Sequence, residues 1–251
     1  MNKETFINKI PDNLFAFLVN MRRQKLYGDR ISIERREGHW LIRSGKIQLY
    51  SYTPKMTSFG MGLFAHKFER IFKIEPGDVC LDVGACIGDT TIPMAIKSEY
   101  ALVLAVEPEK SNLIYLRKNI QYYPTIKIRA KAISNRTGSM DLHVSNSITG
   151  HSLIPDEKSR SADKVIVSCE TLNDLQEHAG PFDFAKIDVQ GSEADIFQTA
   201  SKFLGSVKKL VVETHDFLNE DKQTARFVMP YLEHRFSFIE MTGKGVIHCR
   251  K

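Results

Sequence analysis

The sequence predicts an α/β protein in which helices cover both faces of a mostly parallel β-sheet. The first observation is a series of apolar runs of the kind found in buried strands, at residues 79–85, 101–108, 126–133, 182–189 and 208–215. The second is a helical pattern in the intervals between them, at residues 89–97, 111–122, 193–203 and 222–234. Apolar runs that alternate with helices are typical of parallel strands buried on both faces.

The end of the chain indicates how this sheet is completed. RFSFIEMTG at residues 235–243 and GVIHCR at residues 245–250 are both strand-like, and they meet at a glycine-containing turn. Two strands joined by a short turn pair with each other, so these segments predict an antiparallel hairpin at one sheet edge. The expected architecture is a doubly wound, Rossmann-like, seven-stranded sheet with a C-terminal antiparallel hairpin.

Residues 1–62 precede this pattern. They are expected to form a small N-terminal α/β extension, as a cap or an acceptor-binding region, on a main domain of residues 63–251. Apolar spacing predicts a helix within residues 1–30, and residues 39–52 predict two short strands that turn at Ser44 and Gly45. A glycine-containing loop at residues 56–62 and a helix near residues 63–72 complete the extension and its junction.

The regular alternation is interrupted between residues 133 and 183. Residues 140–146 and 164–170 have strand patterns, and the segment 149–162 between them is polar and loop-like. A loop of this length inside a compact domain is often functional. His151 and Ser152 are therefore candidates for an acceptor pocket, and a plain surface loop is the alternative.

Composition excludes several classes of protein. The chain has 251 residues, 42% hydrophobic and 26% charged, which suits one well-buried domain with a small extension. The apolar run at residues 14–19 is too short for a signal-peptide core or a membrane span. The four cysteines are scattered and form no CxxC pair. A cytoplasmic protein with reduced thiols is expected.

The positive charge is concentrated near the N-terminus. Residues 1–60 hold eleven Lys/Arg and five Asp/Glu, a net +6, whereas the whole chain carries +5. A solvated helical face is one interpretation. The other is a surface for an anionic acceptor such as a phosphorylated sugar, a nucleic acid or a lipid headgroup.

A strand-to-helix turn with two glycines, DVGACIGDT at residues 82–90, indicates a ligand site. Its spacing is GxxxG, whereas the GxGxxG turn places a pyrophosphate against a helix N-terminus. This favours S-adenosyl-L-methionine, which has no phosphate and carries amino and sulfonium charges that Asp82 can meet directly or through water. The turn residues predicted to bind the cofactor are Asp82, Gly84, Ala85, Gly88, Asp89 and Thr90.

Two later strand ends complete the predicted cofactor site. Glu107 follows Gly84 by 23 residues, and a carboxylate there can accept hydrogen bonds from both ribose hydroxyls. Pro108 comes next and stops the strand. Ala132 and Ile133 end the third apolar run, where an apolar surface suits the adenine ring.

Four stretches of the chain resemble the FkbM family of methyltransferases. VCLDVGACIGDTT resembles the first motif of the family, and VEPEKSNLIYLRKNI resembles its ribose-binding strand and following helix. VSCETLNDL resembles the segment before the fourth strand. FDFAKIDVQGSEADIFQTASKFL, together with VVETH, resembles the closing motif, which is the most specific to the family. The resemblance covers about residues 76–216.

This resemblance implies a class I methyltransferase fold, S-adenosyl-L-methionine as cofactor, and O-methylation of a hydroxyl on a sugar, glycan or small natural product. The sequence departs from the family at one position. Gln190 stands where the family usually has an acidic residue. If that acid contacts the substrate or a metal in the family, the acceptor or the chemistry of this chain differs.

The catalytic candidates lie at two strand ends, because ligands of an open α/β sheet lie outside the carboxyl ends of its strands. Asp188 ends the fourth run, and Glu213 and His215 end the fifth. His215 is the preferred base for removing the hydroxyl proton, since its ordinary pKa is about 6.5. Asp188 is a base, an orienting group or a metal ligand. No metal is predicted, although Asp188 and Glu213 could hold Mg²⁺.

Three alternatives to the small-molecule or sugar acceptor stay open. The basic N-terminal region favours an RNA methyltransferase, but no RNA-binding module and no NPPY signature are present. The GxxxG spacing disfavours an NAD-dependent oxidoreductase. Gln190 is the one feature that favours a non-catalytic cofactor-binding protein. Nucleic acid is therefore not the favoured partner, and no membrane span is expected.

Overall fold

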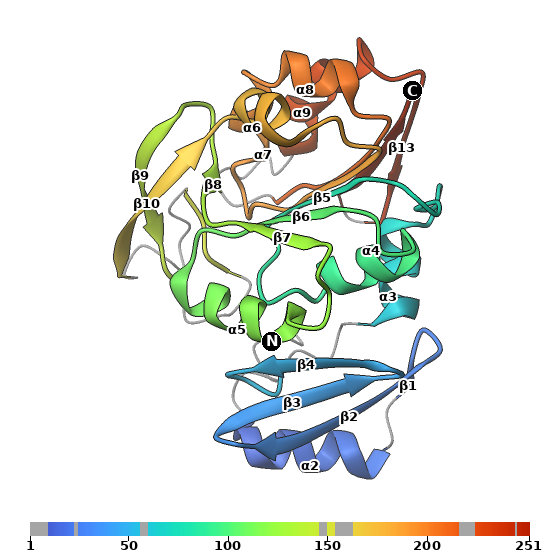
Figure 1. The fold of residues 1–251 in the computed structure, drawn as a ribbon, viewed down its shortest axis with the longest axis vertical. Coiled ribbons are helices and arrows are strands. Elements are labelled where there is room, and N and C mark those ends of the chain that lie inside the picture. Colours follow the sequence, from blue (N-terminus) through green and yellow to red (C-terminus); the bar gives the residue numbers. More distant parts are fainter. Residues whose placement is uncertain are drawn as a thin grey trace.

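A seven-stranded sheet in the order β13-β14-β12-β11-β5-β6-β7 forms the centre of the computed structural model (Figure 1). The structure describes residues 10–22, 25–55, 60–145, 150–153, 163–215, 224–243 and 245–251. Neighbours among β5, β6, β7, β11 and β12 pair in parallel, and the β13–β14 hairpin adds antiparallel to β12. The predicted fold class is confirmed. The strands are β5 (Cys80–Val83), β6 (Val103–Val106), β7 (Ile126–Arg129), β11 (Phe184–Ile187), β12 (Lys209–Glu213), β13 (Phe238–Thr242) and β14 (Val246–Arg250).

Helices cover both faces of this sheet because its strands are apolar on both sides. Cys80 and Phe184 share one core with α3, α4 and α5, while Leu81 and Ala185 share the other with α6 to α9. Figure 1 shows the second group of helices above the sheet and the first group below it. None of the described helices has the length and apolar character needed to cross a membrane. The helices are α3 (Met61–Phe68), α4 (Thr91–Lys97), α5 (Lys110–Ile120), α6 (Leu172–Ala179), α7 (Glu193–Phe197), α8 (Ser201–Ser206) and α9 (Thr224–Glu233).

Two helices differ from the sequence prediction. The single helix predicted over residues 193–203 is two helices, α7 and α8. Helix α6 was not predicted, yet its sequence carries a start signal. The Thr171 side chain and the Asp174 side chain each accept a hydrogen bond from the other residue's backbone N–H, which is a capping box.

The third strand of the sheet ends earlier than predicted. Strand β7 ends at Arg129, and Ala132–Ile133 form β8, which pairs with β10 (Lys164–Glu170) in a separate three-stranded sheet completed by β9 (Gly138–His143). Arg129 Nη2 and Lys131 Nζ lie 2.6 and 3.0 Å from a carboxylate oxygen of Glu170 on β10. These ion pairs join the chain to β10, so the prediction that Ala132 and Ile133 end a strand of the main sheet is wrong.

The N-terminal region forms a second layer beneath the main sheet (Figure 1). The predicted helix is confirmed as α2 (Asp12–Arg22), and residues 1–9 lie outside the described residues. From residue 25 to 30 the helix prediction is wrong, because this segment contains a short strand, a turn and the start of a second strand. In that second strand, Ile31 and Ile33 alternate with exposed residues in the two-residue period of a strand. The N-terminal sheet has the order β1-β2-β3-β4 and includes the two strands predicted within residues 39–52. Its strands are β1 (Lys25–Leu26), β2 (Asp29–Arg36), β3 (His39–Ser44) and β4 (Ile47–Ser51).

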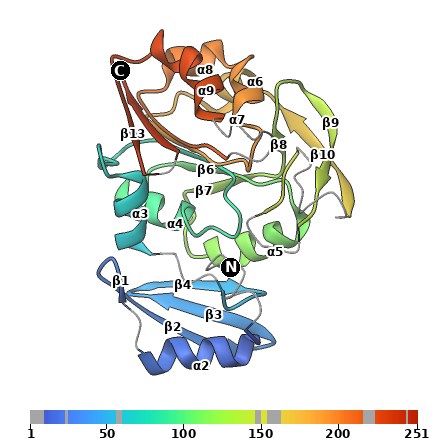
Figure 2. The same cartoon turned by 180° about the vertical axis from the view of Figure 1, so that it is seen from behind.

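One buried side chain, Asn119 of α5, joins this N-terminal sheet to the main domain. Its amide oxygen accepts a hydrogen bond from Tyr50 N at 2.7 Å. Its amide nitrogen donates to Tyr50 O at 3.0 Å and to Ile87 O at 2.8 Å. The edge strand β4, helix α5 and the turn after β5 therefore meet at a single residue. Figure 2 shows β4 next to α5 from behind.

We expect Asn119→Ala to lower the free energy of unfolding by ~2–4 kcal/mol, because buried backbone groups would lose their partners. Chemical denaturation measures this change. The matched control is Arg117→Ala, an exposed position on the same helix, which should stay within about 0.5 kcal/mol of the parent. Equal effects of the two substitutions would contradict the assigned linkage.

Candidate active site

The predicted site residues lie at the carboxyl edge of the parallel strands. The glycine-containing turn follows β5, Glu107 follows β6, and Asp188 follows β11. Glu213 is the last residue of β12, and His215 comes two residues later. Parallel pairing of neighbouring strands therefore brings segments from distant parts of the sequence to one edge.

The two glycines of the turn are required for different reasons. Gly84 has φ +79°, and a Cβ there would lie 1.9 Å from the carbonyl oxygen of Asp188, so only glycine permits this approach of two strand ends. Gly88 has φ +97°, and a Cβ there would lie 3.1 Å from Leu116 Cδ1 on α5. The space at Gly88 is thus used for packing the turn against a helix, a role that its spacing in the sequence does not reveal.

Asp82 is completely buried beneath this turn. One carboxylate oxygen accepts hydrogen bonds from the hydroxyls of Thr90 at 2.7 Å and Thr91 at 2.6 Å. The other lies 3.2 Å from Nζ of Lys186 on the neighbouring strand. Burial opposes the charge on Lys186, but Asp82, Asp188 and Asp89 outweigh it and raise the pKa of the ammonium group. Both carboxylate oxygens of Asp82 therefore lie against protein groups.

Asp89 begins the segment that leads into α4 and is half-buried. Burial raises its pKa to about 6, with Lys186 opposing the rise and Asp82 adding to it. A cation placed next to this carboxylate would stabilise its ionised form.

Glu107 is buried, with two hydrogen bonds from the backbone. Its Oε2 accepts from Cys86 N at 2.9 Å, and its Oε1 accepts from Glu109 N at 2.9 Å. Burial raises its pKa to about 7, although these backbone hydrogen bonds oppose the rise. The Asn112 side-chain nitrogen also donates to Oε1, at 3.5 Å, so Oε2 is the oxygen that keeps a second lone pair for a ligand.

The remaining predicted cofactor residues lie in two different parts of the structure. Ala85 is buried within the turn, and Pro108 is half-buried directly after Glu107. Ala132 and Ile133 are buried in the side sheet, where each belongs to a cluster of protein side chains. They follow β7 in the chain, so they stay near the edge that their sequence position predicts, although not on the predicted strand.

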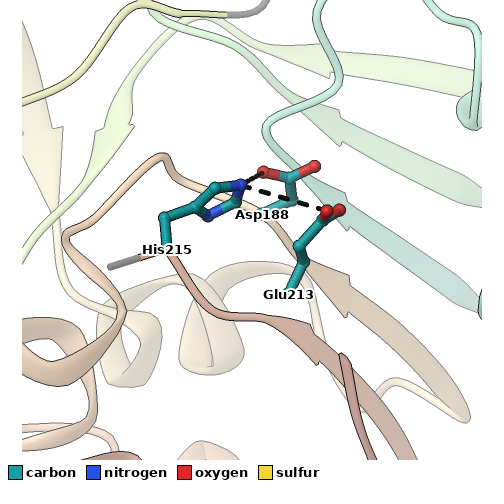
Figure 3. Close-up of side chains that lie close together, drawn as sticks. All are labelled: Asp188, Glu213 and His215. Carbon is teal, nitrogen blue, oxygen red and sulfur yellow. Dashed lines mark ion pairs between the residues drawn. The ribbon is translucent and has the colours of Figure 1, made fainter. Parts of the chain in front are cut away.

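Asp188, Glu213 and His215 are brought together, as Figure 3 shows. The Nε2 atom of His215 lies 3.8 Å from Asp188 Oδ1 and 4.0 Å from Glu213 Oε1. Two lysines balance these acids. Lys186 Nζ lies 3.7 Å from Asp188 Oδ2, and Lys67 Nζ from α3 lies 2.5 Å from Glu213 Oε2.

Two further residues belong to this cluster. Glu193 is fully buried at the start of α7, and its Oε1 lies 2.8 Å from His215 Nδ1. The Gln190 side-chain nitrogen lies 3.0 Å from His215 Nε2 and 2.8 Å from Asp188 Oδ1. The sequence drew attention to Gln190 only as a departure from the family pattern. No local pattern in the sequence links Gln190 or Glu193 to His215.

The charges around His215 determine its protonation. Burial alone would lower the pKa of His215, but the hydrogen bond to Glu193 and the charges of Asp188 and Glu213 raise it above its ordinary value. Burial would raise the pKa of Asp188, and Lys186, His215 and Lys67 lower it instead. Burial and the charge of Asp188 raise the pKa of Glu213 against the effect of Lys67.

The same three side chains offer ligand atoms within 4.8 Å of one another, a spacing that suits a metal ion. Each of the three side chains already has a protein partner. Lys67 pairs with Glu213, Lys186 pairs with Asp188, and the Gln190 amide contacts Nε2 of His215. A cation would therefore have to displace protein partners. The geometry suits a proton-transfer site better than a preformed metal centre.

The polar loop after β9 also reaches this region. The hydroxyl of Ser152 donates to the backbone oxygen of Gln190 at 2.6 Å, which connects the loop to the turn after β11. His151 Nδ1 accepts from Ser145 N at 3.1 Å, and burial lowers the pKa of His151 while Glu109 opposes the change. Most of the predicted loop, residues 154–162, lies outside the described residues.

S-adenosyl-L-methionine fits the groups at the cofactor end of this edge. Oε2 of Glu107 retains a lone pair for a hydroxyl donor, and burial raises the pKa of both Asp89 and Glu107 by destabilising their charged forms. A ligand with cationic groups and a ribose would stabilise those charged forms.

One solved structure with a TM-score above 0.5 agrees with the fold. The chain is 12% identical to a chain of the fibrillarin/Nop5p complex, with a TM-score of 0.53 over 87% of this chain and 97% of that chain. It is 12% identical to the fibrillarin pre-rRNA processing protein of Methanococcus jannaschii, with a TM-score of 0.47 over 87% and 96%. It is also 12% identical to precorrin-6y C5,15-methyltransferase from Geobacter metallireducens, with a TM-score of 0.45 over 74% and 84%.

A comparison with curated proteins finds no match. The family model of the methyltransferase FkbM domain matches residues 82–239, from Asp82 on β5 into β13. This span is well over half of the chain and includes both the cofactor turn and the cluster at β11 and β12. The chain therefore belongs to the FkbM family of S-adenosyl-L-methionine-dependent methyltransferases.

Proposed function

We propose that this methyltransferase acts on a hydroxyl of a sugar, glycan or small natural product, with His215 as the general base. The observation that carries the proposal is the position of His215. A histidine supported by the buried Glu193 lies at the carboxyl edge of the sheet, just after β12, which is the strand next to β11. The end of β11 contacts the cofactor turn at Gly84.

The cofactor-binding role is proposed for the residues near β5 and β6. Glu107 accepts the ribose hydroxyls, and Asp89 stabilises the cationic end of the cofactor. Asp82 holds Lys186 and Thr90 in place beneath them. Gly84, Ala85, Gly88 and Pro108 shape the backbone of this pocket, and Ala132 and Ile133 remain the proposed adenine neighbours.

The reaction requires transfer of one proton from the acceptor. When bound, S-adenosyl-L-methionine supplies the methyl group. His215 Nε2 takes the proton that the acceptor hydroxyl loses, and Asp188 and Glu213 stabilise the imidazolium that results. Holding the hydroxyl oxygen in line and removing its proton both increase the rate.

The charge of this edge favours a neutral acceptor. Three acids surround His215, namely Asp188, Glu193 and Glu213. Two lysines lie nearby, Lys67 and Lys186, and the charge of Lys186 is shared with Asp82. Excess negative charge repels a phosphate. RNA methylation is therefore the weaker alternative, although the basic residues of the first 60 positions would suit it.

The N-terminal extension is proposed to cap the cofactor side of the site. Burial raises the pKa of Tyr52, directly after β4, well above its ordinary value, and the nearby Cys86, Glu109 and Glu107 raise it further. Tyr52 thus lies close to the cofactor turn. A cytoplasmic location is also proposed, because the four cysteines are buried at scattered positions and form no CxxC pair, which suits a reducing compartment.

We expect Glu107→Ala to weaken the binding of S-adenosylhomocysteine about tenfold or more, since hydrogen bonds to a charged group contribute ~1.5–3 kcal/mol each. Isothermal titration calorimetry measures the affinity. Glu177→Ala, at an exposed position on α6, is the matched control and should bind as the parent does. Unchanged affinity in Glu107→Ala would remove this residue from the site.

We expect His215→Ala to lower kcat by ~10²–10⁴-fold, the usual contribution of a positioned base, while cofactor affinity stays within about twofold. His178→Ala, an exposed histidine on α6, controls for the loss of an imidazole. Turnover that survives in His215→Ala would mean that another group takes the proton, or that none is needed.

The acceptor class is tested by transfer of a labelled methyl group to a panel of neutral sugars and polyols, phosphorylated sugars and RNA. Label on neutral hydroxyl acceptors is expected, and EDTA should leave the activity intact. Label on RNA, with binding that weakens steeply as salt rises, would favour the nucleic-acid alternative instead. Loss of activity in EDTA that Mg²⁺ restores would require a metal at Asp188, Glu213 and His215.

A further inference from the structure

We infer that Glu193 and Gln190 are positioning residues that fix the tautomer of His215, with Glu193 keeping a proton on Nδ1 and Gln190 directing a donor at Nε2, which makes Nε2 the basic nitrogen. The inference rests on the proposed role of His215 as the base. It adds two residues to the site and states what each one does to the imidazole.

Glu193 determines the proton on Nδ1. Its side chain is fully buried, and Oε1 lies 2.8 Å from His215 Nδ1. The same oxygen accepts the backbone N–H of Gly191 at 3.1 Å. A carboxylate can only accept hydrogen bonds, so Nδ1 must be the donor. The hydrogen bond to Gly191 reaches backward from α7, so it anchors the carboxylate against the preceding turn.

Gln190 determines the state of Nε2. Its amide nitrogen lies 3.0 Å from His215 Nε2 and 2.8 Å from Asp188 Oδ1, and an amide NH₂ group has two hydrogens to donate and no lone pair to offer. The reversed amide would direct its oxygen at the Asp188 carboxylate. Nε2 therefore accepts, and it carries no proton. An acceptor hydroxyl that takes the place of this amide meets a lone pair.

The backbone of Gln190 is held in a conformation that suits this contact. Its φ is +54°, in the left-handed region that few side chains other than glycine and asparagine adopt readily. Its carbonyl oxygen accepts the Ser152 hydroxyl at 2.6 Å. The side chain is thus directed between Asp188 and His215 from a fixed point.

An acidic residue at position 190, usual in the family, would have the opposite effect on His215. A carboxylate beside Nε2 favours the doubly protonated imidazolium, and it would also repel Asp188. Among the described residues, the charged groups that face His215 are Asp188 and Glu213 from the strand ends and Glu193 from α7. Lys186 and Lys67 pair with the first two.

The test is titration of the His215 imidazole by ¹⁵N NMR in the protein bound to S-adenosylhomocysteine, with the resonance assigned by its loss in His215→Asn. We expect the Nδ1–H form in the neutral parent. Glu193→Gln should lower the pKa of His215 by about one unit or more, and Gln190→Glu should raise it by a similar amount. The acidic limb of the kcat/KM profile should move in the same two directions. Glu177→Gln, an exposed carboxylate, should change neither.

A proton on Nε2 in the neutral parent, or a His215 pKa that neither variant moves, would overturn the inference. A merely structural Glu193 would lower the melting temperature and leave the titration in place. If Glu193→Gln does not fold, the parent tautomer and Gln190→Glu still decide the question. If the titrations shift as expected while the acidic limb does not follow, the inference stands and the proposed role of His215 as base fails.

Discussion

The ammonium group of Lys186 makes the contact on which the rest of the site depends. It lies 3.2 Å from Asp82 on β5 and 3.7 Å from Asp188 after β11, and it donates to the carbonyl oxygen of Gly84 at 3.0 Å. The side chains of Lys186 and Asp82 are only 2% and 0% exposed, so each charge relies on the other. Breaking such a buried pair typically costs ~3–5 kcal/mol. This network fixes the glycine-containing turn after β5 against the end of β11, where Asp188 lies.

The same network explains the electrostatic character of the site. Lys186 is shared between acids on both sides, so it neutralises neither side completely, and the edge keeps an excess of negative charge. On the proposed cofactor side, burial together with the charge of Asp82 raises the pKa of Asp89, which suits a cationic ligand. On the proposed acceptor side, the hydrogen bond to Glu193 and the charges of Asp188 and Glu213 raise the pKa of His215, which suits a base that must become positively charged. A single buried lysine thus links the proposed cofactor site to the proposed base.

The sheet and the cofactor turn could be predicted because their signals are local. Apolar runs of strand length and the GxxxG turn can be read within windows of ten residues. The errors arose where a distant partner decided the structure. Strand β7 ends at Arg129 because Glu170, 41 residues later, binds Arg129 and Lys131. The segment after α2 forms a strand because it has β3 to pair with, whereas its apolar spacing had suggested a continued helix.

The sequence by itself determined the family, the methyl donor and the residues that reach the carboxyl edge, since each depends on the order and spacing of residues along the chain. Only the tertiary structure decided which side chains meet there. That Glu193 and Gln190 both contact His215, and that Gly88 makes room for Leu116, follows from how parallel strands and their helices are packed. Those contacts join residues up to 28 positions apart, and no local pattern of charge or hydrophobicity encodes them.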